Sequence, residues 1–185
     1  VGGGGHSFEI LRRGGKVLGI DADEEAIDFV REKWKIESRN WKIAEENLIL
    51  VKGNFREIEK IAHLKEFDRV SGIIFDLGVS SHQLEKEERG FSFQKEGPLD
   101  MRMDKDLSIK ASDLINVLTK GELYELFTKL GEENDSSGIL ERIIGSRRIA
   151  PIKTTRDLVR VIEDGHNINY SRINRATKIF QALRI

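Results

Sequence analysis

The chain has 185 residues, of which 38% are hydrophobic and 34% charged, and its formal net charge is −1. These values suit one domain, or one domain that carries a smaller insertion. No apolar run reaches the roughly 18 to 20 residues that cross a bilayer, so we expect no membrane span. The absence of cysteine excludes disulfides and thiolate metal sites and agrees with a cytoplasmic location.

The first half alternates helical and strand patterns. A glycine loop leads into a helix near Ser7, and further elements are predicted as a strand at 17–20, a helix at 24–34, a strand at 48–51, a helix at 55–64 and a strand at 70–75. The strands are almost continuously apolar, which is typical of a parallel sheet covered on both faces. The sequence therefore predicts an α/β fold.

The second half is helical. Helices are predicted over 111–118, 122–130, 139–147 and 156–163, with no strand between them. Thr119 with Glu122, and Thr154 with Asp157, have capping-box spacing, which places helix starts there. We interpret this part as an all-helical module.

Both ends of the chain are unusual. No methionine leads it, no strand precedes its glycine loop, and residues 176–185 form an apolar pattern that stops abruptly. We interpret the ends as truncations, with the last residues returning to the first domain. Residues 139–185 carry ten Lys or Arg against four acids, which favours a nucleic-acid partner or, on charge alone, a solvated helical surface.

Candidate ligand residues follow the predicted strands, at the edge where open parallel sheets bind ligands. The loop Gly2–His6 offers backbone amides to an anionic group, either a pyrophosphate or the carboxylate of S-adenosylmethionine. Asp21, with Asp23 as a competitor, can accept the hydroxyls of an adenosine ribose. Phe55 either lies against an adenine or packs in the core, and Asp76 ends the third strand. These features alone do not separate a dehydrogenase from a methyltransferase.

A long polar loop after the third strand is more specific. It runs from Asp76-Leu77-Gly78-Val79-Ser80-Ser81 through Gln83-Leu84 to the stretch Arg89 to Asp104. Six other motifs accompany this loop, namely Gly4-Gly5-His6-Ser7, Gly19-Ile20-Asp21-Ala22-Asp23, Gly53-Asn54-Phe55, Gly131-Glu132-Glu133, Pro151 to Thr155 and Phe180 to Ile185. Together with them, this loop resembles the MraW/RsmH family. These bacterial enzymes methylate the N4 amino group of a cytosine in small-subunit (16S) ribosomal RNA. The matching motifs run in family order along the whole chain.

The resemblance implies a Rossmann-like methyltransferase domain interrupted by an all-helical insertion. We assign residues 1–100 to the first part of the S-adenosylmethionine-binding domain, 101–175 to a helical RNA-recognition insertion and 176–185 to the return. It also implies a cofactor set, which consists of Gly4, Gly5, His6, Asp21, Phe55, Asp76 and Gln83. No metal is expected.

For catalysis we predict Asp76, Ser80 and Ser81, with Asp76 accepting a hydrogen bond from the target amino group or orienting the cofactor. For RNA binding we predict a set of arginines, aromatic residues and one lysine: Arg89, Phe91, Phe93, Arg102, Arg147, Arg148 and Lys153. The two aromatic residues alternatively pack the loop onto its domain. The expected partner is small-subunit ribosomal RNA or the assembling small subunit, and a homodimer is left open.

Two other functions compete with RNA methylation. One is a non-catalytic RNA-binding assembly factor that retains the fold. The other is a nicotinamide-dependent oxidoreductase, which the glycine loop and Asp21 would support but which gives no use to residues 89–104.

Overall fold

The computed structural model describes residues 1–133, 137–163 and 170–184, so the predicted last residue of the apolar ending, Ile185, lies outside the described residues. The chain divides into two compact units, Val1–His82 and Gln83–Ile185. The predicted boundary between residues 100 and 101 differs from this division. The three predicted domain ranges therefore stay predictions.

The first unit contains a β-α-β arrangement. Its elements are α1 (Gly5–Arg12), β1 (Val17–Asp21), α2 (Glu24–Trp41), the short 3₁₀ helix η1 (Glu45–Asn47), β2 (Leu48–Lys52), η2 (Phe55–Glu57) and α3 (Ile58–Leu64). Strands β1 and β2 are parallel, with Val17 opposite Leu48 and Asp21 opposite Lys52. Parallel strands need a crossover connection, and α2 provides it. The α/β class predicted from the sequence is confirmed.

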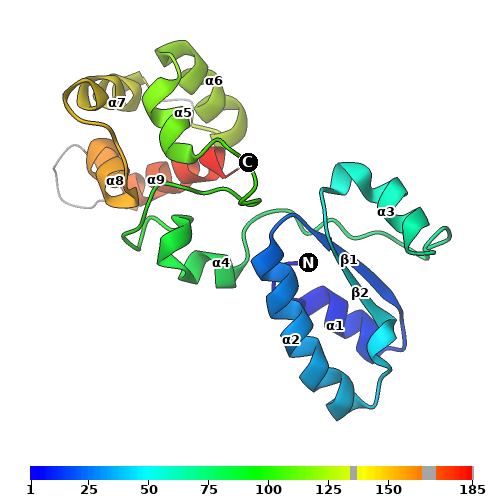
Figure 1. Ribbon diagram of the computed structural model, residues 1–185. Helices are drawn as coiled ribbons and strands as arrows, with labels where there is room; N and C mark the ends of the chain where they lie inside the picture. The colour runs from blue at the N-terminus through cyan, green and yellow to red at the C-terminus, as the bar shows by residue number, and fades with distance from the viewer. Residues whose placement is uncertain (134–136, 164–169, 185) are drawn as a thin grey trace. The chain divides into compact units, whose positions relative to one another are not determined.

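Aromatic side chains form the core of the first unit. Helices α1 and α2 pack against the two strands (Figure 1). Phe8 of α1 stacks on Trp34 of α2 with ring centroids 5.9 Å apart, and Trp41 meets both rings edge-on. The indole N–H of Trp34 donates to the carbonyl of Glu45 at 2.9 Å, so the one polar atom of this ring is satisfied.

The predicted third strand at residues 70–75 is wrong. This segment is irregular, and Ile73, Ile74 and Phe75 expose 59%, 61% and 56% of their surface. An extended segment becomes a strand only when a neighbour completes its backbone hydrogen bonds. Among the described residues, the sheet consists of β1 and β2, and neither pairs with this segment.

The second unit is helical, as predicted. After α4 (Ser81–Glu85) and η3 (Glu87–Arg89), the chain forms α5 (Ala111–Val117), α6 (Lys120–Gly131), α7 (Ser137–Ile149), α8 (Thr155–Glu163) and α9 (Tyr170–Leu183). Helix α6 packs on α7 and α9, and α8 packs on α7 and α9 (Figure 1). Residues 176–184 are therefore part of this helical packing.

Both predicted capping boxes are confirmed. The Thr119 N–H donates to Glu122 Oε2 at 2.8 Å, and the Glu122 N–H donates to Thr119 Oγ1 at 3.3 Å. Thr154 and Asp157 exchange the same two bonds at 3.0 and 3.1 Å. Each pair satisfies two backbone N–H groups that a helix start leaves without partners.

Candidate functional site

The glycine loop is shaped for close approach of a ligand. Gly4 precedes α1 in the left-handed region, with φ 81°, and a Cβ there would lie 2.9 Å from the Phe8 ring. A side chain at this position is excluded by both the backbone conformation and the core beneath it. A Cβ on Gly3 or Gly5 would meet nothing within 4 Å, so the outer side of the loop is open.

Asp21 joins the end of β1 to this loop. Its Oδ2 accepts from the Gly2 N–H at 3.1 Å, and its Oδ1 accepts from the Asp23 N–H at 3.0 Å. Asp23 instead is buried and caps α2, accepting from the Glu25 N–H at 3.1 Å. The competing carboxylate is thus committed to the helix start, which leaves Asp21 as the better candidate for a ribose.

The glycine loop also meets the segment after residue 75. His6 Nδ1 and Asp76 Oδ2 lie 3.1 Å apart, and both side chains are about two-thirds exposed. A Cβ on Gly2 would lie 3.5 Å from the Cβ of Ser80, which places Ser80 beside the loop. Ser81 begins α4 and is exposed. Three sequence motifs that are far apart in the chain therefore converge: the loop, the end of β1 and residues 76–80.

Phe55 presents an aromatic surface in the same unit. It follows β2, is half exposed, and meets the Phe75 ring edge-on at 6.1 Å. The alternative of a buried core phenylalanine is wrong, because half of the residue is accessible. An exposed ring is available for stacking on a planar group.

Gln83, the last residue predicted to contact the cofactor, belongs to the second unit. It is 4% exposed, and its Nε2 donates to the Met103 sulfur at 3.7 Å. Its role toward a cofactor stays a prediction.

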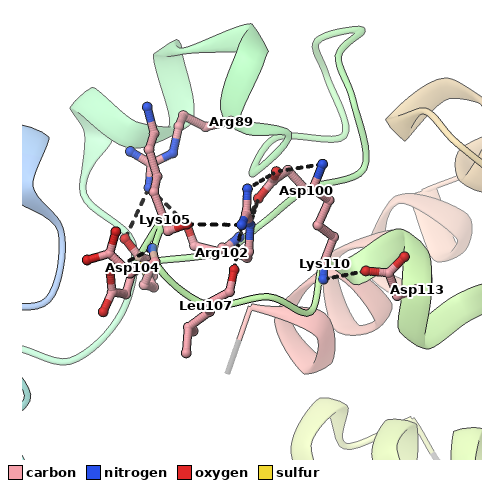
Figure 2. A network of polar contacts seen from close by, with 10 residues as sticks. Arg89, Asp100, Arg102, Asp104, Lys105, Leu107, Lys110 and Asp113 are labelled. Atoms are coloured by element: carbon pink, nitrogen blue, oxygen red, sulfur yellow. Dashed lines mark hydrogen bonds and ion pairs between the residues drawn. The ribbon is translucent and has the colours of Figure 1, made fainter.

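The long loop after Arg89 is ordered by its own polar contacts, and Figure 2 shows their network. Arg102 donates to both carboxylate oxygens of Asp100 at 2.8 and 2.9 Å, and to the backbone carbonyls of Lys105 and Leu107. The loop also pairs with the start of α8, since Leu99 N–H donates to Lys153 O at 2.8 Å.

The Asp100–Arg102 pair shifts the ionisation of both groups. Partial burial alone would raise the pKa of Asp100, but the hydrogen bonds and the charge of Arg102 together lower it below its ordinary value. The hydrogen bond that Arg102 donates to Asp100 raises the pKa of Arg102. The loop is therefore held by an ion pair at neutral pH.

The residues predicted to bind RNA lie in different environments. Arg89 is 3% exposed and donates to the carbonyls of Arg102 and Met103 at 2.9 and 3.2 Å. Phe91 is fully buried under the Arg89 guanidinium, and Phe93 meets Phe180 edge-on at 5.6 Å. In this conformation both aromatic residues pack the loop onto its unit, which was the alternative expectation.

The remaining predicted cations differ in access. Arg147 donates to the Ile115 carbonyl at 2.7 Å and is partly buried. Arg148 and Lys153 are exposed and can reach a phosphate without rearrangement. Contacts of all these residues with RNA stay predictions.

Sequence reasoning missed one feature, a cavity of about 320 Å³ in the second unit. Its lining includes three cations and one acid, namely Arg102, Lys110, Arg184 and Asp100. Arg184 was part of the family motif, but no pattern in the sequence indicates that it meets residues 100–110.

The described residues contain neither a metal-binding cluster nor a membrane-spanning helix. No group of three or more His, Cys, Asp or Glu in residues 1–133, 137–163 and 170–184 is placed to hold a metal ion. In the same ranges, none of the helices has the length and apolar character required of a membrane span.

The family match and the similar proteins of known name agree with each other. The whole chain, residues 1–185, matches the MraW methylase family. It is 41% identical to the ribosomal RNA small subunit methyltransferase H of Clostridium botulinum (strain Loch Maree / Type A3) and of Persephonella marina, and 36% identical to that of Desulfosudis oleivorans. Each alignment covers all of this chain and 59–62% of the relative, so the chain spans about three fifths of these proteins.

Proposed function

Because this chain belongs to the MraW methylase family, we propose that the full-length protein transfers a methyl group from S-adenosylmethionine to the N4 amino group of a cytosine in small-subunit ribosomal RNA. The names of its relatives support methylation of small-subunit ribosomal RNA. The observation that carries the proposal is the convergence of the glycine loop, Asp21 and the His6–Asp76 pair in one unit. The reaction would place the protein in the cytoplasm with ribosomal RNA or assembling small subunits.

The residues of the first unit fit the proposed cofactor. The open side of the loop at Gly3 and Gly5 admits a close ligand, and Asp21 supplies a carboxylate for ribose hydroxyls. The half-exposed Phe55 ring offers a face for an adenine. When bound, the cofactor supplies a methyl group attached to a positively charged sulfur, and the rest of the cofactor leaves as a neutral thioether.

Methyl transfer is an in-line displacement, so the protein mainly has to align the nucleophile and exclude water. The lone pair of the cytosine N4 is delocalised into the ring, which makes the amino group a weak nucleophile. A hydrogen-bond acceptor on that group helps to localise the pair as the new bond forms. Asp76 can be this acceptor, because His6 contacts its Oδ2 and the proposed hydrogen bond from the base would use Oδ1.

His6 would hold Asp76 in place. With a proton on Nδ1, the imidazole donates to Asp76 Oδ2 and fixes the orientation of the carboxylate. The N4 atom must lose a proton after it gains the methyl group, and Asp76 Oδ1 is the nearest basic atom in the proposed arrangement. Ser80, beside the loop, is suited to contact the edge of the base, which must be unstacked to reach this site.

The test is methyl transfer by the full-length protein to small ribosomal subunits, followed by nucleoside analysis of the RNA. With S-adenosylmethionine that carries an isotopic label in its methyl group, we expect the label in N4-methylated cytidine. Label on a protein or on a ribose oxygen would overturn the proposal. Binding of RNA without any methyl transfer would favour the non-catalytic assembly factor instead.

A further inference from the structure

The cavity in the second unit combines positive charge with an apolar lining. Its volume is about 320 Å³, and its apolar wall includes Met101, Met103 and Leu183. The polar groups on it are Arg102, Lys110, Arg184 and Asp100, so the cations exceed the acids by two. Apolar side chains beside these charges reduce their contact with water on one side, which strengthens their attraction to an anion.

The Arg102 cation is already neutralised. It binds both oxygens of Asp100 and two backbone carbonyls, which uses its planar array of donors. Its side chain is 19% exposed. Arg102 therefore shapes the cavity wall, and the excess charge resides on the other two cations.

Arg184 has donors to spare. One Nη2 bond goes to the Phe91 carbonyl, and the guanidinium lies 6.0 Å from the Phe180 ring. The Nε atom is buried with no acceptor among the described residues. Burial lowers the pKa of Arg184, yet an arginine remains charged at neutral pH. Arg184 is partly buried and makes one hydrogen bond with the described residues, so most of its five N–H donors are available to a further partner.

The Lys110 ammonium is loosely paired. Its Nζ lies 3.9 Å from Asp100 Oδ2, and half of its side chain is exposed. Its backbone is fixed more firmly than its ammonium, because its N–H donates to Asp113 Oδ2 at 2.8 Å at the start of α5 (Figure 2). The ammonium can therefore swing toward a ligand while its attachment stays in place.

We propose that this cavity binds a backbone phosphate of the RNA substrate through Lys110 and Arg184. The inference rests on the proposed function and deepens it by giving the RNA a specific anchor in the second unit. A phosphate accepts from a guanidinium and an ammonium together, which matches the two cations with spare donors. Asp100 would not repel it strongly, since Arg102 neutralises that carboxylate.

The experiment measures the affinity of the full-length protein for a small-subunit RNA fragment at several salt concentrations. Lys110→Gln removes a half-exposed charge and leaves the buried network intact, and Arg184→Lys keeps the charge but loses the planar donors. Lys129→Gln is the matched control, because its 70% exposed side chain lies outside the cavity lining and pairs with Glu125. Thermal melts establish that each variant is folded.

We expect Lys110→Gln to weaken binding by about tenfold, the loss of one hydrogen bond to a charged group. It should also reduce the slope of log affinity against log salt by about 0.7, the value for one phosphate on a single strand. Arg184→Lys should weaken binding as well while the slope changes less. Equal affinities and slopes for Lys110→Gln and Lys129→Gln would overturn the phosphate site.

Methyl transfer by the wild-type protein is measured in parallel. Normal methyl transfer together with unchanged RNA binding by Lys110→Gln means that the phosphate site is wrong and the proposed function stands. Failure of the wild-type protein both to bind RNA and to transfer methyl groups overturns the two proposals together.

Discussion

Arg89 gives the sharpest test of how the long loop is held. It was predicted from the sequence to contact RNA, yet its guanidinium is 3% exposed and donates to the carbonyls of Arg102 and Met103. Arg89→Gln keeps some donor capacity but removes the charge and shortens the side chain. The two carbonyls then lose charge-assisted bonds of about 1.5–3 kcal/mol each, so we expect a loss of about 3–6 kcal/mol in the free energy of unfolding.

The assay is urea unfolding of the full-length protein, with RNA affinity measured against salt on the same samples. Arg148→Gln is the matched control, since Arg148 is exposed. We expect Arg89→Gln to lower the urea midpoint strongly, and Arg148→Gln to leave the free energy of unfolding within about 0.5 kcal/mol of wild type. An unchanged midpoint for Arg89→Gln, accompanied by a salt slope lower by about 0.7, would refute the structural role and assign Arg89 to a phosphate.

Three further perturbations test other parts of the structure. Asp76→Asn should lower the single-turnover rate of methyl transfer by about 100-fold at saturating cofactor, because the uncharged amide is a poor proton acceptor; an unchanged rate with weaker cofactor binding would limit Asp76 to a cofactor contact. Because the pKa of Asp100 is lowered by folding, its ionised form stabilises the fold at pH values above the ordinary pKa of 3.8, and this contribution is lost as pH falls through the pKa of the folded state. The urea midpoints of wild type and Asp100→Asn should therefore differ at neutral pH and converge in acid. Gly131→Ala would place a Cβ 2.7 Å from the Lys178 carbonyl on α9, so it should lower the free energy of unfolding by about 1–3 kcal/mol. The control Gly121→Ala lies on the same helix, where a Cβ meets nothing within 4 Å, and should stabilise the protein slightly. Equal melting temperatures of the two variants would contradict the close packing of α6 on α9.

Local signals predicted most of the elements. The capping pairs at Thr119 and Thr154 have a physical mechanism that acts within four residues, and both formed as expected. The apolar runs of β1 and β2 were also recognisable, because each strand finds its partner across a single helical crossover. Position at the strand ends then directed attention to Asp21 and Phe55.

Features that depend on distant partners were not predictable in this way. Residues 70–75 are as apolar as β1, but pairing depends on a neighbouring strand and not on their own side chains. The burial of Arg89 depends on carbonyls 13 and 14 residues away, which no sequence pattern identifies. The position of Arg184 at the cavity follows from the packing of a helix more than 70 residues beyond the loop that it meets.

Family resemblance added what periodicity could not. The glycine loop, Asp21 and Asp76 taken as separate features fit several nucleotide-binding proteins. The structure brings His6 and Asp76 into contact, which no spacing in the sequence required. The family match over the whole chain is what favours a methyltransferase over an oxidoreductase.

The most direct test of the central claim is mass analysis of nucleosides from small subunits treated with the full-length protein and S-adenosylmethionine, compared between wild type and Asp76→Asn. The proposed function predicts N4-methylated cytidine from the wild-type reaction and at most about one hundredth of its rate of formation from the variant. A wild-type reaction that leaves cytidine unmodified would contradict the proposed function. A variant that methylates cytidine at the wild-type rate would contradict the role of Asp76.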